Sequence, residues 1–289
     1  MIVAENLGKQ WKGFSLQNVT FQLPKGYILG LIGENGAGKT TLLKLLLNVY
    51  APTEGEILLD GRRYQQEEEK IKQDIGFVMQ EDLFIPGFTL EENGDYYGKY
   101  YERFSKEQLL KLLHQFTLNE KDKFGKLSKG EKLKFQFAFA LSHKPRLLIL
   151  DEPTANFDRE FRAQFLKLIT EFIADGEKSV VMATHNTQDL DQIADYIGFL
   201  HQGKMVLFTD RKSLENRYRI VQGERYRIKN LPKQDCIYIE EKKYSWKALM
   251  RHRRWRNYEK ELEVHVPTIE ELMCCLLKAN EGKRGEFLC

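Results

Sequence analysis

Residues 33–41 read Gly33-Glu34-Asn35-Gly36-Ala37-Gly38-Lys39-Thr40-Thr41, which fits the pattern G-x-x-x-x-G-K-[ST]. An apolar segment at 27–32 precedes this loop and predicts a strand, and the leucine-rich segment after it predicts a helix. In such a loop, glycines let backbone N–H groups close around phosphates, and the helix N-terminus adds partial positive charge. We therefore predict that residues 33–41 bind a nucleotide, with the Lys39 ammonium on the β- and γ-phosphates and the Thr40 hydroxyl on Mg²⁺.

Two carboxylates end a second apolar strand. The segment reads Leu147-Leu148-Ile149-Leu150-Asp151-Glu152-Pro153. Asp151 stands where a carboxylate can hold Mg²⁺ through water. Glu152 follows it, where a carboxylate could take a proton from an attacking water. Taken alone, both could be surface acids at a strand end; beside a phosphate-binding loop they favour nucleotide hydrolysis.

The order of patterns along the chain predicts an α/β fold with a mostly parallel sheet. Strand patterns alternate with helical patterns, at 27–32, 75–79, 147–150 and 179–183. Nucleotides bind at the strand ends of such sheets. The first ~25 residues alternate apolar and polar positions, which is typical of antiparallel strands, and a hairpin pattern at 197–208 turns at Gln202-Gly203.

Helical patterns dominate from about 81 to 144, where Thr89 with Glu92 and Ser105 with Gln108 have the spacing of capping boxes. Beyond about Lys212 the composition changes. Strand patterns at 235–240 and 261–266, and a last helix opened by Thr268 with Glu271, predict a small α+β unit. We therefore expect two units, at 1–212 and 213–289.

The overall composition is that of a globular protein. The chain has 289 residues, of which 42% are apolar and 30% charged, and its net charge of +3 is too small to indicate a nucleic-acid partner. Its four cysteines, Cys236, Cys274, Cys275 and Cys289, lack metal-binding spacing, which favours a reduced cytosolic setting. No signal peptide or run of about 18 apolar residues is found, so we expect any membrane-spanning part to belong to another chain.

From residue 1 to about 210, the chain resembles the ATP-binding subunits of ABC transporters. Six short motifs stand in the order that this family has: the P-loop at 33–41, a Q-loop at Gln80, a signature at 127–131, the Walker B strand at 147–152, a D-loop at 156–158 and a switch histidine at His185. The resemblance implies a P-loop NTPase of the ABC ATPase fold. It also implies an antiparallel β subdomain, a helical subdomain at about 81–144 and a small C-terminal α+β appendage.

The resemblance also implies roles for individual residues. Glu152, His185 and Gln80 would be catalytic, and Thr40, Gln80 and Asp151 would bind Mg²⁺. ATP itself would be held by the P-loop and by Trp11, Ser128, Gly130 and Asp158. Trp11 would stack on adenine, whereas Ser128 and Gly130 would face the γ-phosphate of the ATP held by a second subunit.

Each of these residues has a plainer interpretation. Trp11 could be a core aromatic, His185 a structural histidine and Gln80 an ordinary loop residue. Ser128 and Glu131 have the spacing of a capping box, which is compatible with a role at the phosphate.

Two motifs depart from the family's usual residues. The signature has Lys129 and Glu131 in place of Gly and Gln, and we expect activity to survive this change. The D-loop reads Ala-Asn-Phe-Asp instead of Ser-Ala-Leu-Asp and keeps only Asp158, which puts the fine coupling between two sites in doubt.

The function that this resemblance implies is ATP binding and hydrolysis that powers transport through a separately encoded membrane permease. Two ATPase subunits, identical or paralogous, would pair and would lie on the inner face of the cell membrane. The segment Val266-Pro267-Thr268-Ile269-Glu270-Glu271-Leu272-Met273 and the Leu-Ser-Lys-Gly signature are similar to ABC-2-type exporter ATPases of Gram-positive bacteria. These exporters handle antimicrobial peptides, so we expect export of a peptide or antibiotic.

Two alternative functions belong to other classes. A soluble ABC ATPase could act in iron–sulfur assembly or on ribosomes or DNA, and a regulatory module could bind ATP without hydrolysing it. The single cassette and the lack of sustained heptads at 61–127 argue against ribosome and DNA-repair types. Glu152 and His185 argue against the regulatory type, whereas chain length does not separate the iron–sulfur type.

Aromatic residues after Gln80 suggest where a permease docks. Tyr97, Tyr100, Tyr101 and Phe104 fall on one helical stripe, which predicts packing inside the helical subdomain. Tyr96 falls off that stripe, and Phe84 and Ile85 stand in a loop, so we predict that they are exposed and contact the permease. The basic–aromatic segment 251–258 favours a solvated helix face, with anionic lipid or permease as the alternative and nucleic acid as the least favoured one.

Overall fold

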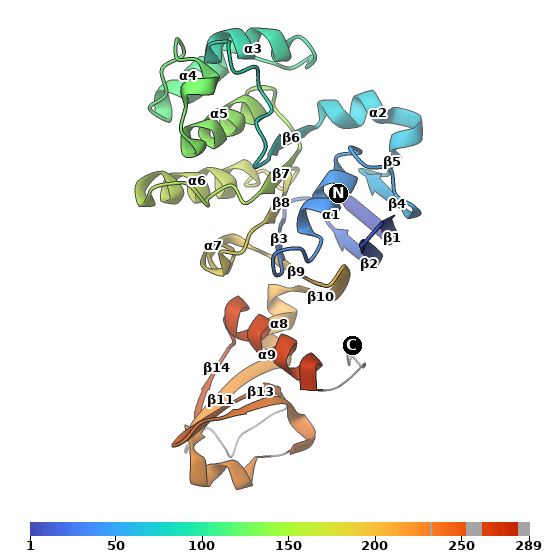
Figure 1. The fold of residues 1–289 in the computed structure, drawn as a ribbon, viewed down its shortest axis with the longest axis vertical. Helices are drawn as coiled ribbons and strands as arrows, with labels where there is room; N and C mark the ends of the chain where they lie inside the picture. Colours follow the sequence, from blue (N-terminus) through green and yellow to red (C-terminus); the bar gives the residue numbers. More distant parts are fainter. Residues whose placement is uncertain (232, 253–261, 283–289) are drawn as a thin grey trace.

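The computed structural model describes residues 1–231, 233–252 and 262–282, so residues 253–258 of the basic–aromatic segment lie outside the described residues. The described residues form a ten-stranded sheet and a four-stranded sheet, with helices around both (Figure 1). Among the same residues, no helix combines the length and the hydropathy needed to cross a membrane.

The larger sheet joins an antiparallel part to a mostly parallel part. Its strand order is β5-β4-β1-β2-β10-β9-β3-β8-β7-β6. The bounds in that order are Arg62–Arg63, Glu54–Leu59, Ile2–Trp11, Phe14–Leu23, Lys204–Asp210, Tyr196–His201, Ile28–Ile32, Ser179–Ala183, Leu147–Asp151 and Ile75–Val78. Strands β9, β3, β8, β7 and β6 are parallel, so their carboxyl ends meet at one edge. The predicted α/β class is confirmed.

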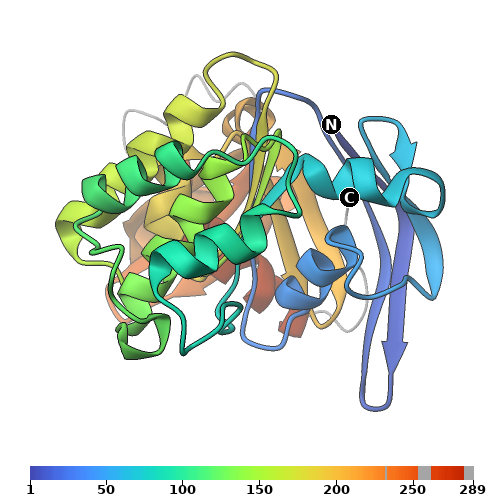
Figure 2. The same ribbon diagram turned by 90° about the horizontal axis from the view of Figure 1, so that it is seen from above.

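Helices cover the parallel strands, which explains why β3, β7 and β8 are buried along their whole length and mostly apolar. From α1 to α7 the helices span Lys39–Leu46, Tyr64–Gln73, Leu90–Gly98, Lys106–Gln115, Lys129–Ser142, Arg159–Phe172 and Thr187–Ile193, and a 3₁₀ turn spans Phe124–Lys126. Helices α3, α4 and α5 (green) lie on one side of the parallel strands, and the antiparallel strands β1, β2 and β4 (blue) lie on the other (Figure 2).

The predicted start of α3 and the predicted hairpin are confirmed. Thr89 and Glu92 form both bonds of a capping box at the N-terminus of α3. In the turn between β9 and β10, Gln202 and Gly203 both take the left-handed backbone conformation, with φ of 46° and 77°. Two successive positive φ values give the turn a twist that matches antiparallel strands.

The prediction that Phe84 is exposed is wrong. Phe84 is only 9% exposed, and the centroid of its ring lies 4.7 Å from the ring centroid of Phe135 and 5.2 Å from that of Phe139. Helix α5 turns both phenylalanines toward the loop after Gln80, and Phe84 fills the space between loop and helix. Tyr96 is 43% exposed, as predicted.

The predicted aromatic stripe is correct except at Tyr100. Tyr97, Tyr101 and Phe104 are partly buried against the core, whereas Tyr100 is 68% exposed. Helix α3 ends at Gly98, so the helical spacing on which the prediction relied does not continue to Tyr100.

The smaller sheet follows α8, which spans Arg211–Arg217. Its order is β12-β13-β11-β14, with bounds Cys236–Glu241, Ser245–Arg251, Tyr218–Glu224 and Glu263–His265. Two 3₁₀ turns span Arg225–Asn230 and Lys233–Asp235, and α9 spans Ile269–Gly282. Strands β12 and β14 fall at the predicted strand patterns. The two central strands, β13 and β11, were not predicted; the Ala-Leu-Met run of β13 also suits a helix. The division at residue 212 stays a prediction.

Candidate nucleotide-binding and hydrolysis site

The P-loop leaves β3 at Ile32 and enters α1 at Lys39. Gly36 and Gly38 take φ of 80° and 109°, a left-handed conformation that glycine adopts without steric cost. At Gly33 an added Cβ would clash with the carbonyl oxygen of Leu200. The shape of the loop therefore requires glycine at these three positions.

The Lys39 side chain folds back into this loop. Its Nζ donates to the carbonyl oxygens of Gly33 at 2.7 Å and Glu34 at 3.3 Å, and the residue is only 7% exposed. Among the described residues, no carboxylate lies within ion-pair distance of this ammonium. Its charge is therefore available to a phosphate.

Asp151 lies at the carboxyl end of β7, directly opposite the P-loop. Its Oδ2 accepts a hydrogen bond from the Thr40 hydroxyl at 2.7 Å. Burial raises the pKa of this carboxyl above its usual range, and the bond from Thr40 opposes that shift. The structure thus brings together two of the three residues predicted to bind Mg²⁺.

Glu152 is held by the loop that follows β8. Its carboxylate accepts hydrogen bonds from the Thr184 hydroxyl at 3.0 Å and from the His185 backbone N–H at 2.9 Å, and it lies 2.7 Å from His185 Nδ1. Its φ is 47°, which is rare for a residue with a side chain and is often found at functional sites. Two of the predicted catalytic side chains, Glu152 and His185, are therefore in direct contact.

Gln80 joins the same site from the segment after β6. Its Nε2 donates to the Glu152 carbonyl oxygen at 2.8 Å and lies 3.4 Å from that of Asp151. A depression of about 420 Å³ lies over these groups. It is lined by Phe14, Glu34, Asn35, Gly36, Gly38, Lys39, Thr40, Thr41, Met79, Gln80, Glu81, Asp151 and Glu152. Four segments that are far apart in the sequence thus meet at the carboxyl edge of the parallel strands.

Trp11 lies outside this depression, at the turn between β1 and β2. It is 37% exposed, so it is not a core aromatic, and its ring lies 5.1 Å from that of Tyr50 and 6.4 Å from that of Phe14. Phe14 itself lines the depression. Phe14 was not predicted as a site residue, because no motif marks it and its position beside Gly38 follows from the fold.

Ser128, Gly130 and Asp158 do not line the P-loop depression of their own chain. Ser128 begins α5 and forms a capping box with Glu131. A Cβ on Gly130 would approach the Asn156 carbonyl oxygen to 2.5 Å, so the signature packs closely on the D-loop. Asp158 caps α6 by accepting from the Phe161 N–H at 2.8 Å. The capping interpretation of Ser128 is correct, and its hydroxyl remains on an exposed helix N-terminus.

We expect Trp11→Ala to weaken ATP binding by about 1 to 3 kcal/mol, the usual range for stacking of a base on an aromatic ring. The free energy of GTP binding should weaken by the same amount, because any base can stack on an aromatic ring. Titration of both nucleotides, with a melting curve for each variant, measures the effect. Phe14→Ala is the matched comparison: if it alone weakens binding, the base stacks on Phe14 and the role of Trp11 is wrong.

Comparison with known proteins gives the family. Residues 16–155 match the family model described as ABC transporter. The linearmycin resistance ATP-binding protein LnrL of Bacillus subtilis is 33% identical over 223 residues, which cover 75% of this chain and 71% of that protein. The bacitracin transport ATP-binding protein BcrA of Enterococcus faecalis is 31% identical over 222 residues, covering 76% and 72%.

A solved structure has the same fold. It is the dimeric ATP-binding cassette MJ0796 in a post-hydrolysis state bound to ADP and Pi, with a TM-score of 0.67 and 26% identity over 73% of this chain and 98% of that one. Together with the P-loop and the Walker B carboxylates, these similarities show that the chain belongs to the ATP-binding proteins of ABC transporters.

Proposed function

We propose that this chain is the ATPase subunit of a peptide or antibiotic exporter, and that it works with a second ATPase subunit and a separately encoded permease. The contact of Glu152 with Thr184 and His185, beside the Thr40–Asp151 pair, is the observation that carries the ATPase part of this proposal. Members of this family hydrolyse ATP to power transport, and the relatives LnrL and BcrA are named for linearmycin resistance and bacitracin transport. We therefore expect the cargo to be a peptide or an antibiotic, and we expect this chain to act at the cytoplasmic face of the membrane.

The residues at the P-loop suit Mg²⁺. Thr40 and Asp151 offer a hydroxyl and a carboxylate oxygen, and Gln80 adds an amide oxygen. Mg²⁺ prefers oxygen ligands and keeps several waters and phosphate oxygens, so few protein ligands suffice. When bound, the ion would neutralise charge on the phosphates.

Glu152 would act as the general base. Its carboxylate is oriented by Thr184 and by the His185 N–H, so little side-chain movement is needed for it to accept a proton from water. If His185 Nδ1–H donates to this carboxylate, His185 Nε2 points away from Glu152. A γ-phosphate oxygen would lie on that side of the ring. Lys39 would neutralise the phosphates during transfer.

A second subunit would complete each site. Ser128 and Gly130 do not line the depression of their own chain, yet Ser128 stands on an exposed helix N-terminus that suits an anion. Two-fold packing would place this end of α5 over the partner's P-loop and would create two identical composite sites. Dimerisation of the solved relative supports this arrangement.

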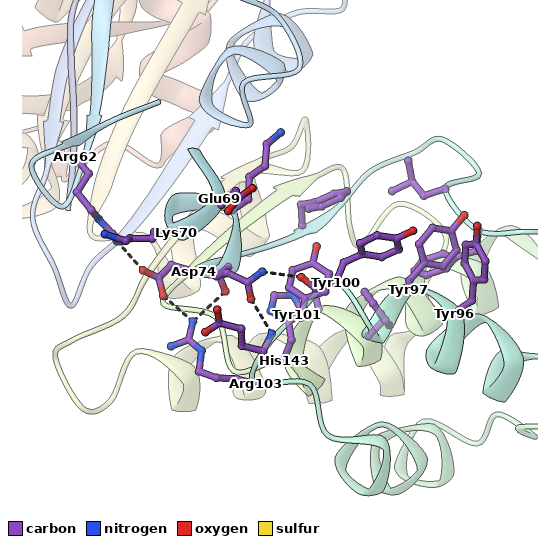
Figure 3. A pocket seen from close by; sticks show the side chains of 18 residues that line it. Arg62, Glu69, Lys70, Asp74, Tyr96, Tyr97, Tyr100, Tyr101, Arg103 and His143 are labelled. Carbon is purple, nitrogen blue, oxygen red and sulfur yellow. Dashed lines mark hydrogen bonds and ion pairs between the residues drawn. The ribbon is translucent and has the colours of Figure 1, made fainter. Parts of the chain in front are cut away.

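The permease would dock in a groove between the helical region and the strands near α2. The groove has a volume of about 1270 Å³, and Tyr96, Tyr97, Tyr100 and Tyr101 form one wall (Figure 3). Across from them, Asp74 binds Arg62 and Arg103, each at 2.6 Å. Burial lowers the pKa of His143, which stacks on Tyr101, to about 4, so the His143 ring is neutral at pH 7.

Leu83 and Phe84 also line the groove, three and four residues after Gln80. A short segment from the permease in this groove would therefore be linked to the hydrolysis site along one stretch of chain. Aromatic anchors around a groove are favoured at protein interfaces.

We expect Tyr96→Ala to leave folding and ATP binding intact and to cost at least about 1 kcal/mol of permease binding, as truncation of an interface anchor does. The measurement is copurification of membrane proteins with the tagged chain from its native membranes, together with partner-stimulated ATPase activity. Tyr244→Ala, at an exposed tyrosine outside the groove, is the matched control. Unaltered copurification, or capture of ribosomes or of an iron–sulfur scaffold protein instead, would argue against the transport proposal.

Phe84→Ala should behave differently because this ring is buried. Removing a core phenylalanine costs about 3 to 5 kcal/mol of the free energy of unfolding, so the melting temperature should fall by several degrees. A variant that melts like the wild type would mean that the Phe84 ring contributes little to the core.

A further inference from the structure

The short helix α7 begins two residues after His185 and connects three parts of the molecule through three consecutive residues. Asp189, fully buried, accepts from the Thr154 hydroxyl at 2.7 Å and from Arg162 Nε at 2.6 Å. Leu190 packs against β3 so closely that a Cβ on Gly30 would lie 2.8 Å from it. Asp191 faces the C-terminal part of the chain.

The partner of Asp191 is the first turn of α9. Its Oδ1 accepts from the backbone N–H of Ile269 at 3.2 Å and lies 3.8 Å from Arg211 Nη2. A carboxylate at a helix N-terminus satisfies a free N–H group and interacts favourably with the helix dipole. The Ile269 side chain is 3% exposed and belongs to the same hydrophobic cluster as Leu190 and Ala194.

One turn further along α9, Met273 lies beside the hydrolysis site. A depression of about 340 Å³ is lined by Met273 together with Ile32, Gly33, Glu34, Asn35, Thr184, His185 and Thr187. The C-terminal helix thus contributes a wall to the space between the P-loop and the histidine loop. Figure 1 shows α9 beneath α7, between it and the four-stranded sheet.

Helix α9 is also fixed to the smaller sheet. Leu272 and Cys275 are buried against Ile220 and Leu249. Lys278 binds Glu240 of β12 at 2.6 Å. The buried apolar contacts hold α9 on this sheet, whereas the Lys278–Glu240 pair is partly exposed to solvent and contributes little to that hold.

We propose that α9 is a positioning element for ATP hydrolysis, which holds α7 through Asp191 and so keeps His185 in contact with Glu152. The proposal rests on the proposed function, because it assumes that these two side chains act on ATP. A helix of seven residues has little stability of its own, so its position depends on tertiary contacts. Asp189 and Leu190 fix two sides of α7, and Asp191 with α9 fixes the third.

Asp191→Ala in the full-length protein tests this. We expect kcat to fall between about fivefold and 10²-fold, as small misplacements of catalytic groups do, while the KM for ATP stays the same because the P-loop is untouched. The NMR signal of the His185 ring, assigned by its loss in His185→Ala, should shift. Asp191→Asn keeps an oxygen acceptor for the Ile269 N–H and should restore kcat to within about twofold of the wild type.

Lys278→Ala is the matched control, because it removes a contact of α9 with its own sheet and leaves α7 untouched. Its kcat and its His185 signal should match the wild type. Met273→Ala changes the side of α9 that faces the histidine loop and leaves the hydrogen bond between Asp191 and Ile269 in place. It should also lower kcat.

Three results would overturn the proposal: an unchanged kcat and ring signal in both Asp191→Ala and Met273→Ala, a change in KM alone, or an equal loss of kcat in Lys278→Ala. The proposed function has a separate test in His185→Ala. If that variant keeps wild-type kcat, the role of His185 is wrong, whatever Asp191→Ala does.

Discussion

Lys39→Ala should weaken MgATP binding by at least about 10²-fold, because the loop loses its buried phosphate counter-charge. The wild-type ammonium is bonded to two loop carbonyl oxygens and to no carboxylate, so its charge is not neutralised before the nucleotide arrives. A hydrogen bond to a charged group contributes about 1.5 to 3 kcal/mol, and this ammonium would form such bonds to two phosphates. Alanine ends at Cβ, so no part of its side chain reaches those phosphates.

Equilibrium titration with a fluorescent ATP analogue measures the loss, and a melting curve shows that the variant is folded. Lys25→Ala serves as the matched control, because Lys25 is an exposed lysine before β3, at the end opposite the P-loop, and pairs with Glu177. It should bind like the wild type. Micromolar or tighter ATP binding by folded Lys39→Ala would mean that residues 33–41 are not the phosphate-binding loop.

Lys39, Asp151 and Glu152 of the candidate hydrolysis site could be predicted from the residues alone, because they stand at fixed offsets from apolar strands, whereas the roles of Gln80 and His185 were expected from the resemblance to ABC transporter subunits. Lys39 follows β3, Asp151 ends β7 and His185 follows β8, and the carboxyl ends of parallel strands meet at one edge. The contact of Glu152 with Thr184 follows from the same geometry, since β7 and β8 are neighbours. Local pattern and the family resemblance together therefore predicted which residues assemble here.

Contacts that depend on packing between distant segments could not be predicted in this way. Phe84 is buried because two phenylalanines of α5 face it, and nothing in the loop sequence shows that a helix about 50 residues later covers it. Asp191 and Ile269 are 78 residues apart, and nothing in the segment 266–273 that contains Ile269 indicates a contact with Asp191. The connection between the C-terminal helix and the histidine loop is therefore a product of tertiary structure alone.

The fold and the site together predict the behaviour of Glu152→Gln. Glutamine has the shape of glutamate and keeps an oxygen that can accept from the Thr184 hydroxyl or the His185 N–H, so the loop after β7 should keep its conformation. It has no carboxylate to take a proton from water. We therefore expect ATP to bind as in the wild type and hydrolysis to slow by about 10² to 10⁴, the usual contribution of a positioned base.

The slowed variant should also accumulate as an ATP-bound dimer. In the proposed arrangement the bound ATP lies between the P-loop of one subunit and the Ser128 helix of the other, and only hydrolysis removes the γ-phosphate that joins them. Gel filtration with ATP should then show a dimer for Glu152→Gln, and a monomer when ADP replaces ATP. Glu160→Gln, an exposed glutamate in the first turn of α6, is the control and should hydrolyse like the wild type. If Glu152→Gln itself keeps the wild-type rate, the base is another residue, and the contact of Glu152 with His185 has a structural role in holding the loops after β7 and β8 together.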